Sequence, residues 1–444
     1  LFSAHVLSAI DPMLIKPLFT EPKTVKVLND FTFHQPPRLD LKVSGAWNDV
    51  KQLKASGPVI VRDAVYRGNW ASNVTATIHY TDRFIGVTKA LMVHDGRELR
   101  SSGLSLDLKA QHIWITNAVS DVDPLVVTRF IGPQTTRAVE PYKFATPPHV
   151  ILHGSLPFRG ADLTDLHFEV EGGPFQYWKF NLPHIKASVH WVTNFLSITN
   201  VVGDFHQGRL RGEALFDFRP EKNADFRFHA IASEADFHSL MSDLSTPTNK
   251  LEGTLNVELT VTSANTADWG SWQGYGYAQL LDGYLWDIPL VGMLSPVLDS
   301  MVTGLGRSRI SEGLMTYQMT NSVIRTKDLE LKGNSMRLQY GGTCDFAGNV
   351  DARVEAELFR DSNMVGRVFG YVLTPITKLL EYKVTGTLGR PKMEPLFIPK
   401  FLFFPLQPFK TMKDLFESDK PEPPKAPAPS PAQPKESPPP PAPK

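Results

Sequence analysis

Apolar and polar residues alternate along much of this chain. Between Leu255 and Val261 every second residue is apolar, and the residues between them are Asn256, Glu258 and Thr260. The stretch from Val350 to Leu358 repeats the pattern with charged residues at the alternate positions. A period of two places successive side chains on opposite faces of a strand. Strands with one apolar and one solvated face are typical of antiparallel sheets, so the chain is predicted to be mainly β.

Short helices are predicted between groups of strands. Asp11-Pro12, Asp123-Pro124 and Asp287-Ile288-Pro289 each combine a residue that caps free N–H groups with a proline that fits the first helical turn. After the third signal, apolar residues at helical spacing predict a helix within residues 290–301. A second apolar stripe, from Val365 to Leu380, predicts an amphipathic helix that a proline interrupts.

A repeat of about 111 residues organises the chain. Pro36-Pro37 recurs as Pro147-Pro148 (147 − 36 = 111), and Phe84 recurs as Phe195 within a similar stretch (195 − 84 = 111). Self-similarity at a fixed period indicates a repeated supersecondary unit, so we expect an elongated tandem-repeat antiparallel β-sheet. The residues from Pro36 to Leu108 should then match those from Pro147 to Phe218 strand for strand.

A third, looser copy carries an insertion at about Trp286 to Ser311. The predicted units are residues 1–120, 121–231 and 232–395, followed by an apolar segment at 396–420 and a tail at 421–444. Proline makes up 12 of the 24 tail residues, which predicts a disordered extension.

Composition narrows the function. Lys+Arg and Asp+Glu both number 46, which gives a formal net charge of +0. A protein that binds nucleic acid needs a basic excess to neutralise phosphates, so we expect no nucleic-acid partner. Cys344 is the only cysteine, which excludes an intrachain disulfide and argues against a cysteine-based zinc site. The sequence opens at Leu1 without a basic segment, and we expect a fragment whose N-terminal membrane anchor is missing.

No arrangement of residues points to catalysis. Gly274-Tyr275-Gly276 lacks the third glycine of a dinucleotide fingerprint and lies in an alternating stretch. His184 and His190 are six residues apart, a poor spacing for a shared metal ion, and we expect both on the surface of an edge strand. We therefore expect no enzyme activity, no cofactor and no metal site.

The apolar faces of the strands are the first candidate functional surface. An ordinary sandwich core would bury them, but only short helices are available to cover one face. An open, curved sheet would instead offer a groove for acyl chains. The residues predicted to line this groove are Leu255, Val257, Leu259, Leu329, Leu331, Met336, Leu338 and Val354.

The second candidate surface is the segment from Leu396 to Leu406. It is too short to span a bilayer, and its prolines forbid a regular helix. It either packs over the open end of the sheet or inserts reversibly into a membrane interface. The predicted membrane contacts are Phe397, Phe401, Phe403 and Phe404.

The third repeat resembles a known family over about Leu251 to Pro395. A glycine-bounded strand runs from Gly274 to an Asp-Gly turn at Gly283, Ile288-Pro289 starts a helix, and Gly386-Thr387-Leu388 ends the motif. In this order the features resemble the C-terminal region of AsmA-like envelope proteins, the group of AsmA, TamB and YhdP. The resemblance implies an inner-membrane-anchored protein that projects into the periplasm and carries phospholipid towards the outer membrane in a β-taco-like groove, without catalytic residues.

Three classes of function remain open at this point. The leading hypothesis is phospholipid transfer or outer-membrane lipid homeostasis, with acyl chains and a membrane surface as partners and acyl burial as the driving force. The alternative is an assembly factor whose sheet edge pairs with strands of outer-membrane proteins. The third is glycan binding, for which Trp269 to Tyr277 is the only suitable aromatic cluster.

Overall fold

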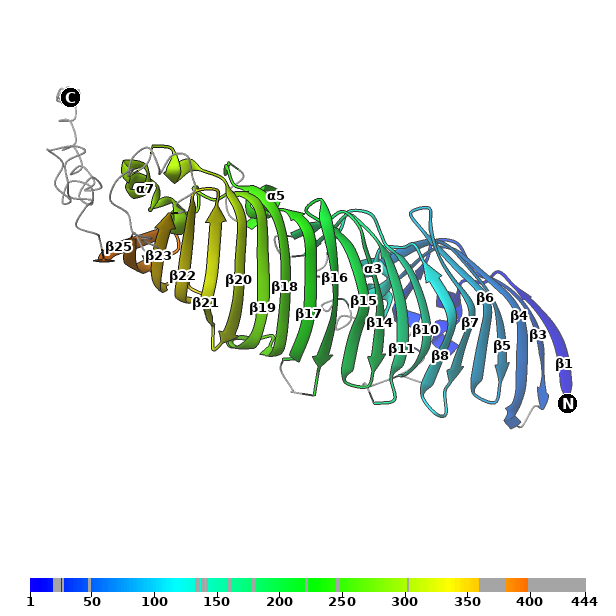
Figure 1. Ribbon diagram of the computed structural model, residues 1–444. Helices are drawn as coiled ribbons and strands as arrows, with labels where there is room; N and C mark the ends of the chain where they lie inside the picture. Colours follow the sequence, from blue (N-terminus) through cyan, green and yellow to red (C-terminus); the bar gives the residue numbers. More distant parts are fainter. Residues whose placement is uncertain are drawn as a thin grey trace, which may run out of the picture. The chain divides into compact units, whose positions relative to one another are not determined.

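The computed structural model describes residues 1–397 apart from short gaps (Figure 1). The residues left out are 19–24, 26–27, 47–48, 132–135, 137–139, 141–142, 159–161, 178–179, 220–222, 245–247, 302, 359–379 and 398–444. The predicted tail at 421–444, and most of the segments predicted at 365–380 and 396–420, lie outside the described residues.

The strands fall into three groups of six. The first group is β3 (Arg38–Ala46), β4 (Asp49–Tyr66), β5 (Asn69–Thr81), β6 (Phe84–His94), β7 (Arg97–Asp107) and β8 (His112–Ser120). The second is β10 (His149–Pro157), β11 (Asp165–Gly172), β14 (Ile185–Val192), β15 (Phe195–Phe205), β16 (Gly208–Asp217) and β17 (Asp225–Asp236). The third is β18 (Glu252–Asn265), β19 (Asp268–Tyr284), β20 (Ile310–Thr320), β21 (Val323–Gly333), β22 (Met336–Asp345) and β23 (Val350–Leu358).

Seven further strands complete the described fold. Four belong to the same sheet: β1 (Phe2–Ser8), β2 (Phe31–Phe33), β24 (Leu380–Thr387) and β25 (Arg390–Phe397). The other three form a small separate sheet: β9 (Lys143–Phe144), β12 (Phe175–Tyr177) and β13 (Phe180–Leu182).

One antiparallel sheet of 22 strands therefore runs through the described chain (Figure 1). β1 pairs with β3, and from β3 onward each strand pairs with the next strand of the sheet, with β8 beside β10 and β17 beside β18. Over the described strands the sheet does not close on itself. The mainly β, repeat-built fold predicted from the alternation is confirmed.

The strand bounds reproduce the repeat. β6 and β15 differ by 111 residues at both ends (195 − 84 and 205 − 94), and β21 begins 239 residues after β6 (323 − 84). Each group of six strands continues the sheet of the group before it, so the repeats share one continuous structure.

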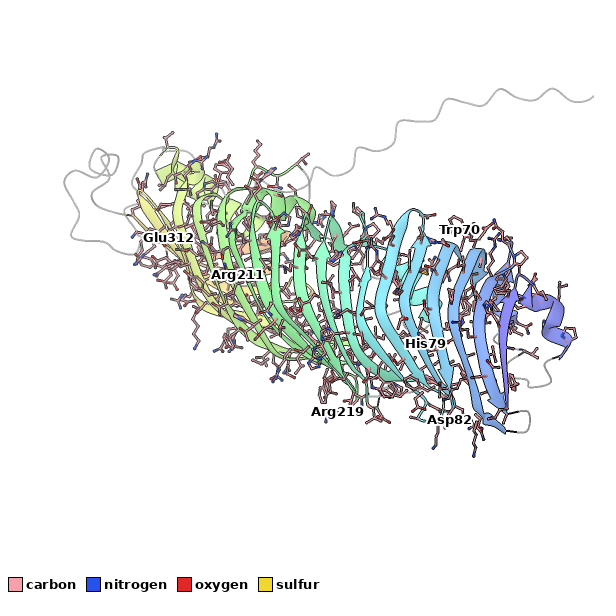
Figure 2. All side chains as sticks on the ribbon, turned by 90° about the vertical axis from the view of Figure 1, so that its right-hand side faces the viewer. Trp70, His79, Asp82, Arg211, Arg219 and Glu312 are labelled. Atoms are coloured by element: carbon pink, nitrogen blue, oxygen red, sulfur yellow. The ribbon has the colours of Figure 1, made fainter. Side chains whose placement is uncertain are left out.

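Connections alternate between the two long edges of the sheet, because successive strands are antiparallel. The first edge carries the turns after the first, third and fifth strand of each repeat, and we call it the turn edge. The opposite edge carries the connections after the second, fourth and sixth strand, and we call it the helix edge. Figure 2 shows Asp82 and Arg219 at the turn edge and Trp70 at the helix edge.

The described helices belong to connections at the helix edge. They are α1 (Pro12–Ile15), α3 (Pro124–Ile131), α5 (Phe237–Leu244), α6 (Pro289–Gly292) and α7 (Ser295–Met301), with 3₁₀ turns at Lys16–Leu18 and Leu305–Arg307. α3 and α5 follow the sixth strand of a repeat, α1 follows β1, and α6 and α7 lie in the insertion between β19 and β20.

The predicted helix starts at Pro12, Pro124 and Pro289 are confirmed, but the aspartate cap expected for the third is wrong. A carboxylate oxygen of Asp11 accepts the N–H of Met13 at 2.9 Å, and Asp123 accepts the N–H of Leu125 at 2.8 Å. Asp287 does not cap α6. Ile288 occupies the N-cap position, and the Asp287 carboxylate accepts the N–H of Lys250 at 2.8 Å instead.

Bulges bend the strands at recurring positions. Lys89 in β6 and Asn200 in β15 occupy equivalent places (200 − 89 = 111) and have φ of 51° and 52°. Asn117 in β8 and Glu234 in β17 have positive φ near the helix-edge end of the sixth strand. Such a residue inserts one extra position, bends its strand and increases the local twist. The recurrence accounts for the curved strands in Figure 1.

Candidate functional site

The predicted groove residues share one face of the sheet. Leu255 lies opposite Leu280. On β20, Gly313 lies opposite Leu280 on one side and opposite Leu331 on the other. Leu331 lies opposite Leu338, which in turn lies opposite Ala356. Residues opposite one another in an antiparallel pair point to the same side, as do residues two apart on one strand. We call this side the apolar face and the other the outer face.

Helices close this face over part of the third repeat. The Tyr340 hydroxyl donates to the carbonyl of Leu290 at 3.4 Å, which places α6 over β22, and Leu294 and Leu298 beside it are buried. Burial raises the pKa of Tyr340 well above its usual range. Four predicted groove residues therefore belong to a closed core: Leu331, Met336, Leu338 and Val354, which are 0–4% exposed.

The other four predicted groove residues, Leu255, Val257, Leu259 and Leu329, are only half-buried. The prediction that all eight residues line an open groove is therefore corrected for the four in the core. The sequence pattern determines which face of the sheet a side chain is on, but the insertion between β19 and β20 determines where that face is covered.

The apolar face of the first two repeats is poorly covered. Among the described residues, 22 of the 30 buried hydrophobic residues lie at or after Leu251, and five of the eight before it are alanines. Leu99 and Leu210 occupy the position of Leu338 in their repeats and are half-buried. The long apolar side chains from β3 to β17 thus remain partly open to solvent.

A ladder of backbone hydrogen bonds joins the turns at the turn edge. In each step the residue after a strand donates its N–H to a carbonyl of the neighbouring turn at 2.8–2.9 Å. The steps run from Leu108 to Arg83, Phe158 to Gln111, Thr193 to Thr164, Phe218 to Asn194, Thr266 to Ala224, Phe346 to Ser322 and Leu388 to Gly348.

Large apolar residues stand on five of these seven steps. Leu108, Phe158, Phe218, Phe346 and Leu388 are each 36–44% exposed, and we call them the turn-edge rim. Phe218 stacks on Phe216 of the apolar face, with ring centroids 6.3 Å apart. The rim therefore extends the apolar face to the border of the sheet, and sequence reasoning missed it. Three of the five, Leu108, Phe218 and Phe346, have a sequence signal, because each directly follows an aspartate that ends the fifth strand of a repeat.

The outer face is polar. His229 lies 3.0 Å from Glu258, and Lys186 donates to Glu171 at 3.1 Å. The aromatic cluster considered for glycan binding is divided between the faces. Trp269 stacks on Trp272 at the apolar face, with ring centroids 5.0 Å apart, whereas Tyr275 alternates with glycines of that face and points outward.

The membrane-contact prediction is only partly covered by the structure. Phe397 is the last residue of β25 and is 46% exposed, so the strand extends past the predicted boundary at residue 395. Phe401, Phe403 and Phe404 lie outside the described residues, and their membrane contact stays a prediction.

Cys344 offers no reactive thiol. It is half-buried near the end of β22. Burial, with a smaller contribution from the Asp345 carboxylate, raises the pKa of the thiol, which keeps it protonated.

Comparison of the chain with protein-family models, curated proteins and solved structures found no match. None of the helices in the described part of the chain is long and apolar enough to cross a bilayer.

Proposed function

We propose that this chain is a non-enzymatic lipid-transfer protein of the cell envelope that carries phospholipid acyl chains along the apolar face. The observation that carries the proposal is the long apolar face of β3 to β17, which is only half-buried and is bordered by the turn-edge rim. The resemblance of the third repeat to AsmA-like proteins supports a periplasmic location with a membrane anchor.

Acyl burial alone supplies a sufficient driving force. Each buried methylene contributes about 0.8 kcal/mol, so a chain of ordinary length needs no charged site to hold it. Half-buried leucine and phenylalanine side chains lose their remaining water contact when the acyl chain binds. The attraction is non-directional, which allows the chain to slide from one strand to the next.

Val257 and Glu258 give a matched test. Val257 is half-buried on the apolar face, whereas the Glu258 side chain is 48% exposed on the outer face beside His229. Val257→Asp should abolish phospholipid co-purification, measured by native mass spectrometry, because a carboxylate at that position resists desolvation. Glu258→Lys should leave the bound lipid unchanged.

Thermal unfolding of both variants checks that the sheet remains folded. A wild-type chain without bound lipid, or equal losses in the two variants, contradicts lipid transfer.

Strand pairing is the second candidate function. β25 pairs with β24 on one side, and among the described residues no strand pairs with its other side. An open edge of this kind can accept a strand from an outer-membrane protein during its assembly. Pro391 and Pro395 lie in β25 and lack the N–H groups that such pairing uses, which weakens this candidate. Saturable binding of a transmembrane β-hairpin peptide by a lipid-free wild-type chain would favour it.

A further inference from the structure

Three side chains converge on the outer face of the second repeat. Asp165 and His167 are two apart on β11, and His190 lies opposite His167 on β14. Nε2 of His190 lies 2.8 Å from Oδ1 of Asp165, and Nε2 of His167 lies 3.2 Å from the same oxygen. One ligand atom from each residue lies within 4.8 Å of the other two.

We propose that Asp165, His167 and His190 bind a divalent transition-metal ion, with Zn²⁺ as the best fit. Two imidazoles and one carboxylate are a ligand set that this ion accepts at bond lengths of about 2.0–2.2 Å. In a tetrahedral site such bonds place neighbouring ligand atoms roughly 3.3–3.5 Å apart. The 3.2 Å between His167 and Asp165 is near this spacing, and the 2.8 Å between His190 and Asp165 would have to lengthen on metal binding. The side chains are 42–59% exposed, so water completes the coordination.

The sheet holds these ligands in place. β11 lies between β10 and β14, and β14 lies between β11 and β15, so neither is the edge strand expected for His190. The rings of His167 and His190 stack with centroids 3.8 Å apart and planes 17° apart. His153 on β10 stacks on the other side of His167, at 4.8 Å and 5°. The imidazoles are thus aligned before any ion arrives.

The sequence contains a local sign of this site, because Asp165-x-His167 places two ligands on one face of a strand. The third ligand depends on strand register, which the spacing of His184 and His190 does not reveal.

Metal titration tests the site independently of lipid. Isothermal titration of the untagged chain with ZnCl₂ should reveal a site that is lost in the double variant His167→Ala, His190→Ala. Substitution with Co²⁺ should give the visible absorption of a low-symmetry site in the wild type and not in the double variant.

His184→Ala is the matched control. His184 also lies on the outer face beside a carboxylate, 3.6 Å from Glu171, but outside the cluster, and its loss should leave Zn²⁺ binding unchanged. Circular dichroism confirms that the double variant is folded. The proposal is overturned if the wild type binds no Zn²⁺, or if the double variant binds it with the same stoichiometry and affinity.

Discussion

The first and third repeats use the same strand pattern but treat their apolar faces differently. Leu99 and Leu338 occupy the same repeat position (338 − 99 = 239), opposite Met92 and Leu331 respectively. Leu338 is 0% exposed, whereas Leu99 is half-buried. The third repeat has α6 and α7 between its second and third strands, whereas the first has a tight turn there.

The comparison shows that the connection between the second and third strands, more than the strands themselves, determines whether the apolar face becomes a buried core or stays open to solvent. The second repeat also has an insertion in this connection, but there the chain forms β12 and β13 of the small separate sheet. Its apolar face, represented by Leu210, stays half-buried. The insertion of the third repeat closes the face over Leu338 because it carries the buried residues Leu294 and Leu298 back over the strands.

The largest expected effect comes from shortening the matched leucines. Leu338→Ala should cost about 2–5 kcal/mol of stability, because it leaves a cavity in a closed core. Leu99→Ala should cost about 1 kcal/mol, since a half-buried side chain loses less and leaves no enclosed cavity. Urea unfolding followed by circular dichroism measures both. Equal costs would show that the two faces are equally covered, and the comparison would fail.

Substitution of the turn-edge rim is expected to change stability less than Leu338→Ala does, and to act mainly on lipid exchange. The triple variant Leu108→Ser, Phe158→Ser, Phe218→Ser keeps every ladder hydrogen bond, because the donors are backbone N–H groups. We expect slower uptake of fluorescent phospholipid from vesicles, with a melting temperature close to that of the wild type.

Thr266→Ser is the control for the rim variant. It changes another ladder position and retains the hydroxyl that accepts the N–H of Ala224 at 3.0 Å. Uptake as slow in this control as in the triple variant would remove the rim from the transfer path.

Local patterns predicted the elements well. The alternation around Val257 and the offset between Phe84 and Phe195 depend on near neighbours and on direct self-similarity, so they predicted the strands and the repeat. The two Asp-Pro signals likewise predicted helix starts at Pro12 and Pro124.

Features that depend on long-range strand register or on distant segments could not be predicted from the sequence. Leu338 and Leu99 have similar local sequences, and only the folding of a distant insertion separates their burial. The bulge at Lys89 involves a residue type without a preference for positive φ, and the asparagine at Asn200 favours positive φ without indicating a bulge by itself. The cluster of Asp165 and His190 requires the pairing of β11 with β14, which no local spacing encodes.

The smallest expected effect separates the second repeat from the other two. His206, in the turn between β15 and β16, is 7% exposed and lies 2.9 Å from the Ser239 hydroxyl of α5. Its Nε2 has no hydrogen-bond partner among the described residues and lies 3.7 Å from an Asp243 oxygen. Burial lowers the pKa of His206 below its usual value of 6.5, against the opposing effect of Asp243 and Asp236. The equivalent residues in the other repeats are Asp95 and Asn334.

The sign of the pH dependence follows from this lowered pKa. Below about pH 6.5 the unfolded chain binds a proton at His206 that the folded chain resists, so stability is lost as the pH falls. We expect His206→Asn, which copies the third repeat, to reduce the loss of melting temperature between pH 7.5 and pH 5.5. Hydrogen exchange at Phe237–Leu244 should show the same change locally, because α5 covers the imidazole. An unchanged pH dependence in the variant would mean that α5 opens freely enough to hydrate His206, which would make this helix a loose cover, unlike α6 over the third repeat.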